Sequence, residues 1–550
     1  MSLFEDPPDH LQDWPPPSEP VKVARRLIEE DDLRHDDGNL TLRWWRGCFY
    51  EWTGSHWLEI ADPTIRAGLY QMLDGAMYYK AVQDGDPELV PWAPTRRKVG
   101  DVLEALQAVA HLSERTGPPA WIDGEEGGQV LAVRNGLLDL DGRKLADHTP
   151  RLFNLHALPY DYDPQAPPPR RWLRFLRQLW PGDPDSRRLL AEWFGYVLSG
   201  DTRLQKILLL VGPPRSGKGT IARVLTALVG KANTAGPTLA SLATNFGLAP
   251  LLGKPLAIVS DARLGPDTHA VIERLLSISG EDAITVDRKH RDAWTGQLPT
   301  RFTVISNELP NFGDASGAIA SRFEILTLTR SWLGKERPRL TDELLEELPG
   351  ILLWALKGLD RLRDQRHFTG PAASRDAVKA LADLTSPVGA FVREACELDP
   401  AHEIPRRTLY QAWRRWSKDH GRDRATTDAV FGRDLRAAFP GIQDGRPHIG
   451  GRRTRIYQGI RLSETYAAYV EGTAHQESNG GPVHDGPWSN PLRAVPESAG
   501  QASSEHAAFE WVFADQPVGA CVVCGNQCVT LDDHAHPCHP RCREREGAGR

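Results

Sequence analysis

Residues 207–229 read ILLLVGPPRSGKGTIARVLTALV, and this stretch decides the fold of the chain. Ile207 to Val211 is an unbroken apolar run, which is typical of a parallel strand buried on both faces. A loop rich in Gly and Pro follows, and after Lys218 the apolar residues recur at helical spacing. A strand, a glycine-rich loop with lysine and a helix, in this order, predict a phosphate-binding loop. The alternative is a strand–turn–helix with a chance Gly-Lys pair.

The predicted nucleotide-binding residues are Gly212, Pro213, Pro214, Arg215, Ser216, Gly217, Lys218, Gly219 and Thr220. Glycines let backbone N–H groups turn inward around phosphate oxygens, and the helix N-terminus adds partial positive charge. We expect Lys218 to reach the β- and γ-phosphates. Gly219 stands where a Ser or Thr usually holds Mg²⁺, and Thr220 comes one position later. The expected cofactors of this loop are ATP and Mg²⁺.

Length and charge bound the class of protein. A chain of 550 residues is long enough for several domains, and its 40% hydrophobic residues can fill sizeable cores. The net charge of −7 means that any contact with nucleic acid must come from local basic patches. The N-terminus lacks a signal-peptide pattern, and the sequence has no apolar run that could span a membrane. We therefore expect a cytoplasmic protein with no membrane partner.

The part that precedes the loop predicts three segments. Residues 1–20 are rich in Pro and acidic residues, which favours a disordered tail. Residues 21–150 predict an α+β domain with an aromatic β-hairpin at 44–57, an amphipathic helix at 99–109 and a hairpin at 130–140 that turns at Asn135-Gly136. The hairpin aromatics can pack in a core or stack on nucleobases, and their strand spacing favours the core. Residues 151–200 predict a helical linker.

Two more apolar strands follow the loop. Leu256–Ser260 leads into Asp261, at the position expected of an acid that holds Mg²⁺ through water. Arg301–Ser306 leads into Asn307, which can hydrogen-bond the γ-phosphate or the attacking water, or can simply cap a turn. Between them, four basic residues at 288–291 fall at the tip of an expected hairpin. This tip suits a phosphate backbone, and the alternative is a solvated turn.

The phosphate loop, Asp261, the segment Gly280–Arg291 and Asn307 stand in one order, and Ala320-Ser321-Arg322-Phe323 follows. This order of motifs resembles that of the phage and plasmid primase-helicase family. Members of this family are superfamily 3 helicases with an AAA+ fold, and they are related to the poxvirus primase-helicase. The resemblance extends over residues 40–465. It includes N-G-L-L-D-L at 135–140 and W-F-G-Y-V-L-S-G-D-T at 193–202, which look like the family's helicase-associated segment.

The resemblance implies a role for each matched residue. Lys218 matches the phosphate-loop lysine, Asp261 the Walker B acid and Asn307 the sensor. Arg322 matches the arginine finger that enters a neighbour's ATP site, which implies a homo-hexameric ring. Lys289, with His290, matches the hairpin that contacts single-stranded DNA in the central channel. The expected catalytic set is Lys218, Asp261, Asn307 and Arg322.

The chain also departs from the family pattern. Relatives often carry a second acid beside the first, whereas Ser260 and Ala262 flank Asp261. The general base for water is therefore unassigned. The part before the loop shows no obvious pair of catalytic acids for nucleotidyl transfer. We expect helicase activity without primer synthesis, and a separate primase or an origin-binding protein as partners.

Residues 201–385 are thus the expected AAA+ domain, and residues 386–465 predict a winged helix. Arg433 and Arg436 fall on the outer side of its third helix, and residues 448–462 predict a β-hairpin wing. Arg452, Arg453 and Arg455 at the wing tip suit duplex DNA, and the alternative is a solvated basic surface.

The end of the chain predicts a flexible linker over 466–515 and a zinc-binding tail over 516–550. The pairs Cys521-x-x-Cys524 and His539-x-x-Cys542 suit a closed tetrahedral site for structural Zn²⁺. Cys528, His536 or Cys538 can replace one of these ligands.

The sequence predicts an α/β fold with a P-loop ATPase core on a parallel sheet, which is the core of an ATP-dependent replicative DNA helicase of a phage or mobile element. Two alternatives stay open. The loop G-P-P-R-S-G-K-G-T resembles that of adenylate kinases, which points to a nucleotide kinase. A DNA-binding initiator that uses ATP only to assemble is the other alternative.

Overall fold

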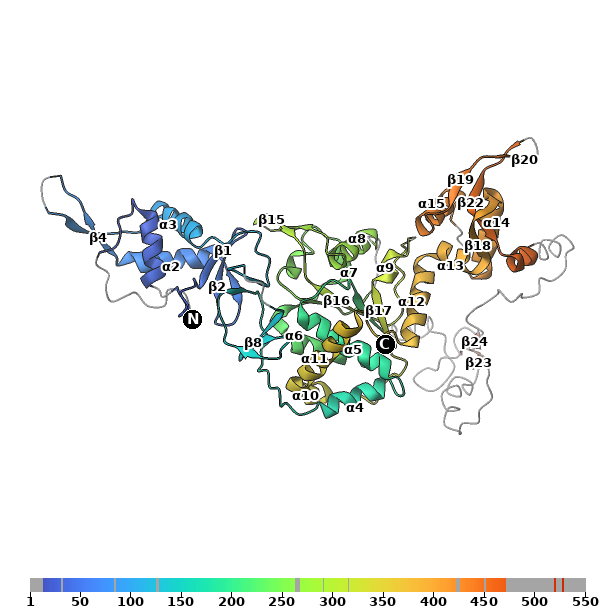
Figure 1. Cartoon of the computed structure of the whole chain (residues 1–550), viewed down its shortest axis with the longest axis horizontal. Coiled ribbons are helices and arrows are strands. Elements are labelled where there is room, and N and C mark those ends of the chain that lie inside the picture. Colours follow the sequence, from blue (N-terminus) through green and yellow to red (C-terminus); the bar gives the residue numbers. More distant parts are fainter. Residues whose placement is uncertain are drawn as a thin grey trace. The chain divides into compact units, whose positions relative to one another are not determined.

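The computed structural model describes residues 13–470 and the backbone of 519–520 and 527–528 (Figure 1). Within the first range it omits 31–32, 84–85, 125–127, 263–267, 290, 315, 422–425 and 450–451. The chain divides into two units, Met1–Val483 and His484–Arg550. In the second unit, β23 (Gly519–Ala520) pairs antiparallel with β24 (Gln527–Cys528). Everything below concerns the first unit.

A five-stranded parallel sheet carries the predicted phosphate loop. Its strands, in spatial order, are β12 (Thr234–Ala235), β13 (Leu256–Val259), β16 (Arg301–Ser306), β11 (Ile207–Val211) and β17 (Phe323–Thr327). All neighbouring pairs are parallel. Every residue of β11, β13 and β16 is buried, as expected of central strands covered on both faces. The predicted α/β class and the central parallel sheet are therefore confirmed.

Alternate residues of β11 pack in two different cores. Leu208 and Leu210 join helices α4 (Arg170–Leu179), α5 (Pro184–Ser199), α6 (Lys218–Val229), α10 (Leu340–Leu345) and α11 (Leu348–Gln365). Ile207, Leu209 and Val211 join α7 (Leu239–Leu242), α8 (Thr268–Ser279), α9 (Ala318–Ser321) and α12 (Ala372–Thr385). A short 3₁₀ turn η1 (Lys231–Asn233) connects α6 to β12, and η2 (Ala249–Leu251) lies between α7 and β13. The alternation of a strand thus builds a sheet with helices on both faces.

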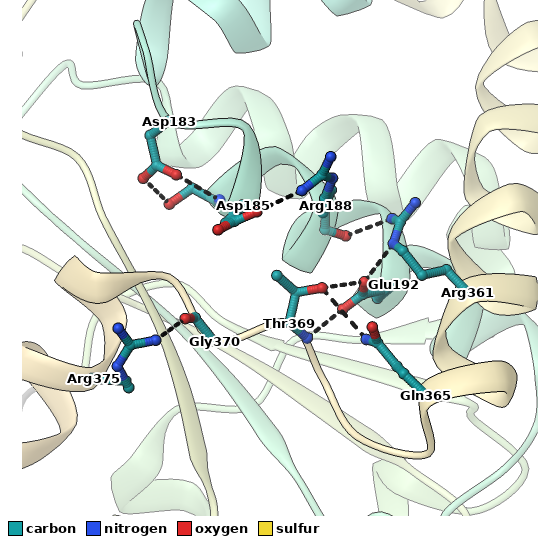
Figure 2. A network of polar contacts seen from close by, with 10 residues as sticks. Asp183, Asp185, Arg188, Glu192, Arg361, Gln365, Thr369, Gly370 and Arg375 are labelled. Carbon is teal, nitrogen blue, oxygen red and sulfur yellow. Dashed lines mark hydrogen bonds and ion pairs between the residues drawn. The ribbon is translucent and has the colours of Figure 1, made fainter.

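A buried carboxylate fixes the chain between α11 and α12 to α5. Glu192 of α5 is 0% exposed, and its oxygens accept from Arg361 Nε at 2.6 Å, from the Thr369 N–H at 2.7 Å and from Thr369 Oγ1 at 2.6 Å (Figure 2). These bonds satisfy a charge that would otherwise be costly to bury. The helices that cover one face of the sheet are therefore tied together by a polar contact as well as by their apolar packing.

The N-terminal region contains helices and small antiparallel sheets. Its elements are α1 (Pro20–Glu30), β1 (Leu42–Trp45), β2 (Cys48–Trp52), β3 (Trp57–Ile60), α2 (Asp62–Asp74), β4 (Met77–Lys80), β5 (Glu88–Pro91), α3 (Arg96–Val109), β6 (Ala120–Trp121), β7 (Val130–Val133), β8 (Gly136–Asp139), β9 (Leu145–Ala146) and β10 (Leu152–Phe153). Trp45, Trp52 and Trp57 of the β1–β2–β3 sheet are all less than 10% exposed. Their burial agrees with the predicted core role.

Two sequence expectations about this region were wrong. Trp14 falls in the segment that was predicted to be disordered, but it is 2% exposed and packs with Val23 and Leu27 of α1. The large apolar ring of a Trp stabilises such packing even in a segment rich in proline. The hairpin at 130–140 turns at Arg134-Asn135, since Val133 pairs with Gly136. The Asn135 side chain donates to the Tyr162 carbonyl and accepts from the Tyr162 N–H, and these two hydrogen bonds hold Asn135 in the turn.

Two further parts of the first unit matter for the site. β14 (Ile284–Arg288) and β15 (Arg291–Gly296) form the predicted antiparallel hairpin. The C-terminal part contains α13 (Pro387–Ala395), β18 (Cys396–Pro405), α14 (Arg406–Asp419), α15 (Asp428–Ala438), β19 (Gln443–Gly445), β20 (His448–Ile449), β21 (Arg452–Arg453) and β22 (Ile456–Leu462). Among the described residues, no helix combines the length and apolar character needed to cross a bilayer.

Candidate nucleotide-binding site

The predicted phosphate loop joins the carboxyl end of β11 to the N-terminus of α6, and Lys218 is the first residue of that helix. The Lys218 ammonium donates to the carbonyl oxygens of Gly212 and Pro213, to Ser216 Oγ at 3.3 Å and to Asn307 Oδ1 at 3.2 Å. It is 6% exposed, and burial lowers the pKa of its amine. The loop therefore wraps around its own lysine and holds the charge inside the turn.

Two glycines permit this tight wrapping. A Cβ on Gly212 would lie 2.2 Å from the Leu328 carbonyl oxygen, so no side chain fits there. Gly217 has φ +103°, in the left-handed region that favours glycine. Among the described residues, the backbone N–H groups of Arg215, Ser216 and Gly217 have no acceptor. Donors that converge at a helix N-terminus without partners fit the oxygens of a phosphate.

The loop forms one wall of a cleft of about 880 Å³. Phe175 of α4 and the segment 332–341 form other walls. This segment is tied to the loop, because the Trp332 N–H donates to the Arg215 carbonyl at 3.1 Å and Ser331 Oγ donates to the Pro214 carbonyl at 2.8 Å. Lys335 of the same segment lines the cleft, whereas Glu336 pairs with Arg215 at 3.6 Å and Arg337 pairs with Glu343 at 2.7 Å. This wall was not predicted from the sequence, where its signal is a Trp among basic residues.

The polar residues after the neighbouring strands lie at the same edge of the sheet as the loop. Asn307 follows β16, which is hydrogen-bonded to β11, and this adjacency brings Asn307 to Lys218. Asp261 lies two positions after the end of β13, separated from β11 by β16, and its side chain is exposed. Ser260 lines the cleft, whereas Asp261 does not. The structure therefore brings together Lys218 and Asn307 and leaves Asp261 at the rim.

Residues for a divalent cation are sparse at this edge. Thr220 lines the cleft and its Oγ1 accepts from Arg223 at 3.3 Å. Within the described part of the chain, no group of three or more His, Cys, Asp or Glu side chains could hold a metal ion. Mg²⁺ bound mainly by the phosphates of its nucleotide needs only one or two protein oxygens, and Thr220 and Asp261 fit that small role.

Arg322 lies at the opposite edge of the sheet. It directly precedes β17, whose first residue Phe323 pairs with Ile207 at the start of β11, whereas the loop follows Val211 at the end of β11. A five-residue strand separates the two edges by about 13 Å. Arg322 is half-buried and donates to Gln205 Oε1. Its position in the fold keeps it away from the phosphate loop of its own chain.

The predicted DNA-contacting hairpin is held against the N-terminal sheet. Lys289 is exposed at its tip, and His290 lies outside the described residues. Arg288 and Arg291 approach Cys48 Sγ at 3.5 Å, and Arg291 also pairs with Glu59. The two arginines therefore serve the contact with β2 and β3, and Lys289 is the described tip cation that faces solvent.

The C-terminal arginines differ in their surroundings. Arg433 pairs with Asp434 at 2.9 Å and Arg436 with Asp444 at 3.2 Å, so neighbouring acids compensate both charges. Arg452 and Arg453 form β21 of the β20–β21 hairpin, and Arg453 and the following Arg455 are exposed. The predicted zinc ligands Cys521, Cys524, His539 and Cys542 lie outside the described residues.

Two stretches of the chain match known families. Residues 24–181 match a family described as D5 N terminal like. Residues 210–322 match a family of unknown function, DUF5906, and this stretch runs from β11 to Arg322. Neither match spans half of the chain. The first supports a primase-helicase-like relationship and contains residues 135–140, one of the two stretches that resemble the family's helicase-associated segment.

Individual proteins that are similar to this chain share at most 25% sequence identity among those described here. An uncharacterized mitochondrial protein, ymf21, of Marchantia polymorpha is 25% identical over 129 residues, which are 22% of this chain and 72% of that protein. An A-form apo structure of the NrS-1 C-terminal region shares 13% identity over 76% of this chain and 97% of its own, with a TM-score of 0.44. A second A-form structure, of residues 305–718, shares 13% over 80% and 100%, with a TM-score of 0.43.

Proposed function

We propose that this chain is a primase-helicase-like replication protein of a phage or mobile element, and that it hydrolyses ATP in the cleft at the carboxyl edge of the sheet to unwind DNA. The observation that carries the proposal is the Lys218 ammonium, buried inside a loop whose backbone N–H groups are free to bind phosphate. The strand order places Asn307 beside the loop, where its amide can contact the terminal phosphate of a bound nucleotide. This arrangement supports a reaction at that phosphate.

Each residue near the cleft has a role that follows from its position. Lys218 exchanges its carbonyl contacts for phosphate oxygens and compensates their charge. Asn307 orients the terminal phosphate or the attacking water, because its side chain already lies 3.2 Å from the lysine. Thr220 in the cleft and Asp261 at its rim are the residues that would hold Mg²⁺, which would offset phosphate charge when bound. The general base stays unassigned.

The position of Arg322 supports a trans arrangement. One strand length separates Arg322 from its own loop, and in this proposal a second copy of the chain supplies the charge to the cleft. An arginine that stabilises charge on the γ-phosphate from a neighbouring subunit is a known device in phosphoryl transfer. The proposal therefore includes a ring of identical subunits, with six as the number that the resemblance implies.

DNA is the proposed partner of two surfaces. Lys289 at the tip of the β14–β15 hairpin suits the backbone of single-stranded DNA, and Arg453 and Arg455 suit a duplex. The region 386–465, proposed as a winged helix, has the helices and the small antiparallel sheet that such a domain needs. The zinc-binding tail stays a proposal from its sequence spacing alone.

The first test is ATP hydrolysis by the full chain with and without single-stranded DNA, on wild type and on Lys218→Ala in parallel. We expect DNA to stimulate turnover in the wild type and Lys218→Ala to abolish it. Lys218-dependent turnover that DNA leaves unchanged would contradict the motor, and phosphoryl transfer to a nucleoside monophosphate would replace it with a kinase.

A further inference from the structure

A second cavity, of about 520 Å³, lies at the amino edge of the same sheet. Arg46, Asn154, Arg288, Trp294 and Arg301 are among the residues that line it, and none of its lining residues also lines the nucleotide cleft. Arg301 is the first residue of β16, and its N–H donates to Pro255, just before β13. The cavity therefore lies between the starts of these strands and the aromatic β1–β2–β3 sheet.

The charge of this second cavity is unbalanced. Four cations line it, Arg46, Lys254, Arg288 and Arg301, together with a single carboxylate, Glu59, which already pairs with Arg291. Arg301 is 3% exposed, and its Nη1 and Nη2 donate to the carbonyl oxygens of Pro299 and Val197. Burial lowers its pKa to about 10, and Tyr196 and Asp201 offset part of that shift. The cations that line the cavity outnumber its carboxylates, and a bound anion would offset that excess charge.

Its buried polar atoms also lack partners. Asn154 is 4% exposed, and its Nδ2 donates to the His156 carbonyl at 2.8 Å, but its Oδ1 has no hydrogen-bond partner in the described structure. Arg301 Nε is likewise buried without an acceptor among the described residues. Both atoms are enclosed by their neighbours, so the wall of the cavity is closely packed at Asn154 and Arg301.

An aromatic surface completes the cavity. Trp294 of β15 is half-buried, and the Arg46 guanidinium lies 5.2 Å from its ring centre and 4.8 Å from that of Trp45. The Arg46 Nη1 donates to the Thr295 carbonyl at 3.0 Å, which keeps it beside the ring. Planar rings and guanidinium groups are the surfaces on which single nucleobases stack.

We infer that this second cavity binds one nucleoside monophosphate unit, with its phosphate near Arg301 and Arg288 and its base against Trp294 and Arg46. The excess of cations suits a phosphate, the Trp294 ring suits a base, and a volume of 520 Å³ is in the range of small-ligand pockets. A nucleotide of single-stranded DNA and a free nucleotide share this chemistry. The inference does not depend on ATP hydrolysis at the other edge.

The experiment uses full-length Lys218→Ala without ATP, so that the phosphate loop contributes no specific binding. The probes are thymidine 5′-monophosphate, followed by saturation-transfer NMR, and a fluorescein-labelled oligothymidylate, followed by anisotropy. Arg46→Ala should weaken binding by roughly tenfold, the loss of one charge-assisted contact. Arg97→Ala, on an exposed position of α3, is the matched control and should leave binding unchanged.

Asn154→Asp is the second variant, because Arg46 also bonds the hairpin and its loss can move Lys289. The new carboxylate compensates the buried cations and repels the phosphate, and thermal melting verifies that the chain is folded. Weakened oligothymidylate binding alone assigns the cavity to a DNA strand, and weakened monophosphate binding assigns it to a free nucleotide. Unchanged binding of both probes in folded Arg46→Ala and Asn154→Asp overturns the inference, whatever the ATPase assay shows.

Discussion

The two edges of the parallel sheet carry cationic sites that are built in different ways. At the carboxyl edge, Lys218 lies within one continuous loop and contacts its carbonyls and Asn307. At the amino edge, Arg301 lies among residues drawn from Arg46 to Arg288 and donates to the carbonyl oxygens of Pro299 and Val197. The first site is a local motif that moves with one loop, whereas the second exists only once distant parts of the chain have packed together.

Lys218→Ala tests the carboxyl edge with the largest expected effect. Loss of the ammonium that compensates phosphate charge should lower ATP turnover by at least about 100-fold. Lys379→Ala, at an exposed position of α12, is the matched control and should keep wild-type turnover. Coupled-enzyme kinetics measure both, and near-wild-type turnover in Lys218→Ala would place the chemistry outside this cleft.

Glu192→Ala tests whether the helices that cover the sheet depend on their polar contact. Removal of the buried carboxylate leaves Arg361 and Thr369 without their shared acceptor (Figure 2) and should lower the free energy of unfolding by about 3 kcal/mol. Arg188→Ala removes an exposed i,i+3 ion pair with Asp185 and should cost less than about 0.5 kcal/mol. Urea unfolding compares the two, and equal costs would mean that the Glu192 contacts contribute little.

Asn307→Ala sharpens the roles within the carboxyl edge. If Asn307 orients the terminal phosphate or the water, its loss should reduce kcat by roughly tenfold while nucleotide affinity is retained. Asn311→Ala, on the exposed chain after the same strand, is the control. An equal loss of affinity and of kcat would instead show that Asn307 only holds Lys218 in place.

His156 gives the smallest expected effect, and it concerns the amino edge. Burial, with a further contribution from Arg301, lowers the pKa of His156 from 6.5 to about 4 in the folded chain. Between pH 6.5 and pH 4 the folded protein therefore binds fewer protons than the unfolded chain. The free energy of unfolding is highest above pH 6.5 and decreases as the pH falls toward 4. His156→Gln should flatten the decrease in Tm over this range, and an identical decrease would show that His156 titrates normally.

The strands and the helix at the carboxyl edge could be predicted from the sequence because their signals are local. β11, β16 and α6 have apolar patterns that determine their type, and the glycines and lysine of the loop stand between two of them. The adjacency of Asn307 and Lys218 follows from the position of β16 beside β11 in the sheet, which was not predicted from the sequence. Asp261 was predicted at the right edge, yet its side chain is exposed at the rim.

The amino edge could not be predicted, because its contacts join residues far apart in the chain. Arg288 and Cys48 are 240 positions apart, and no spacing rule connects them. The same tertiary contact changes the residues of the hairpin that can bind DNA, because Arg291 pairs with Glu59 whereas Lys289 stays exposed. Trp14 shows the same limitation on a smaller scale, because composition alone gives no sign of the core that receives it.

The central claim is that the carboxyl edge holds an ATP site that the Arg322 of a neighbouring copy completes. ATP turnover of Lys218→Ala, of Arg322→Ala and of their equimolar mixture tests it most directly. We predict that each variant alone is inactive and that the mixture recovers turnover, since about a quarter of randomly formed interfaces join an intact loop to an intact arginine. Full activity of Arg322→Ala alone, or a mixture that assembles but stays inactive, would contradict the claim.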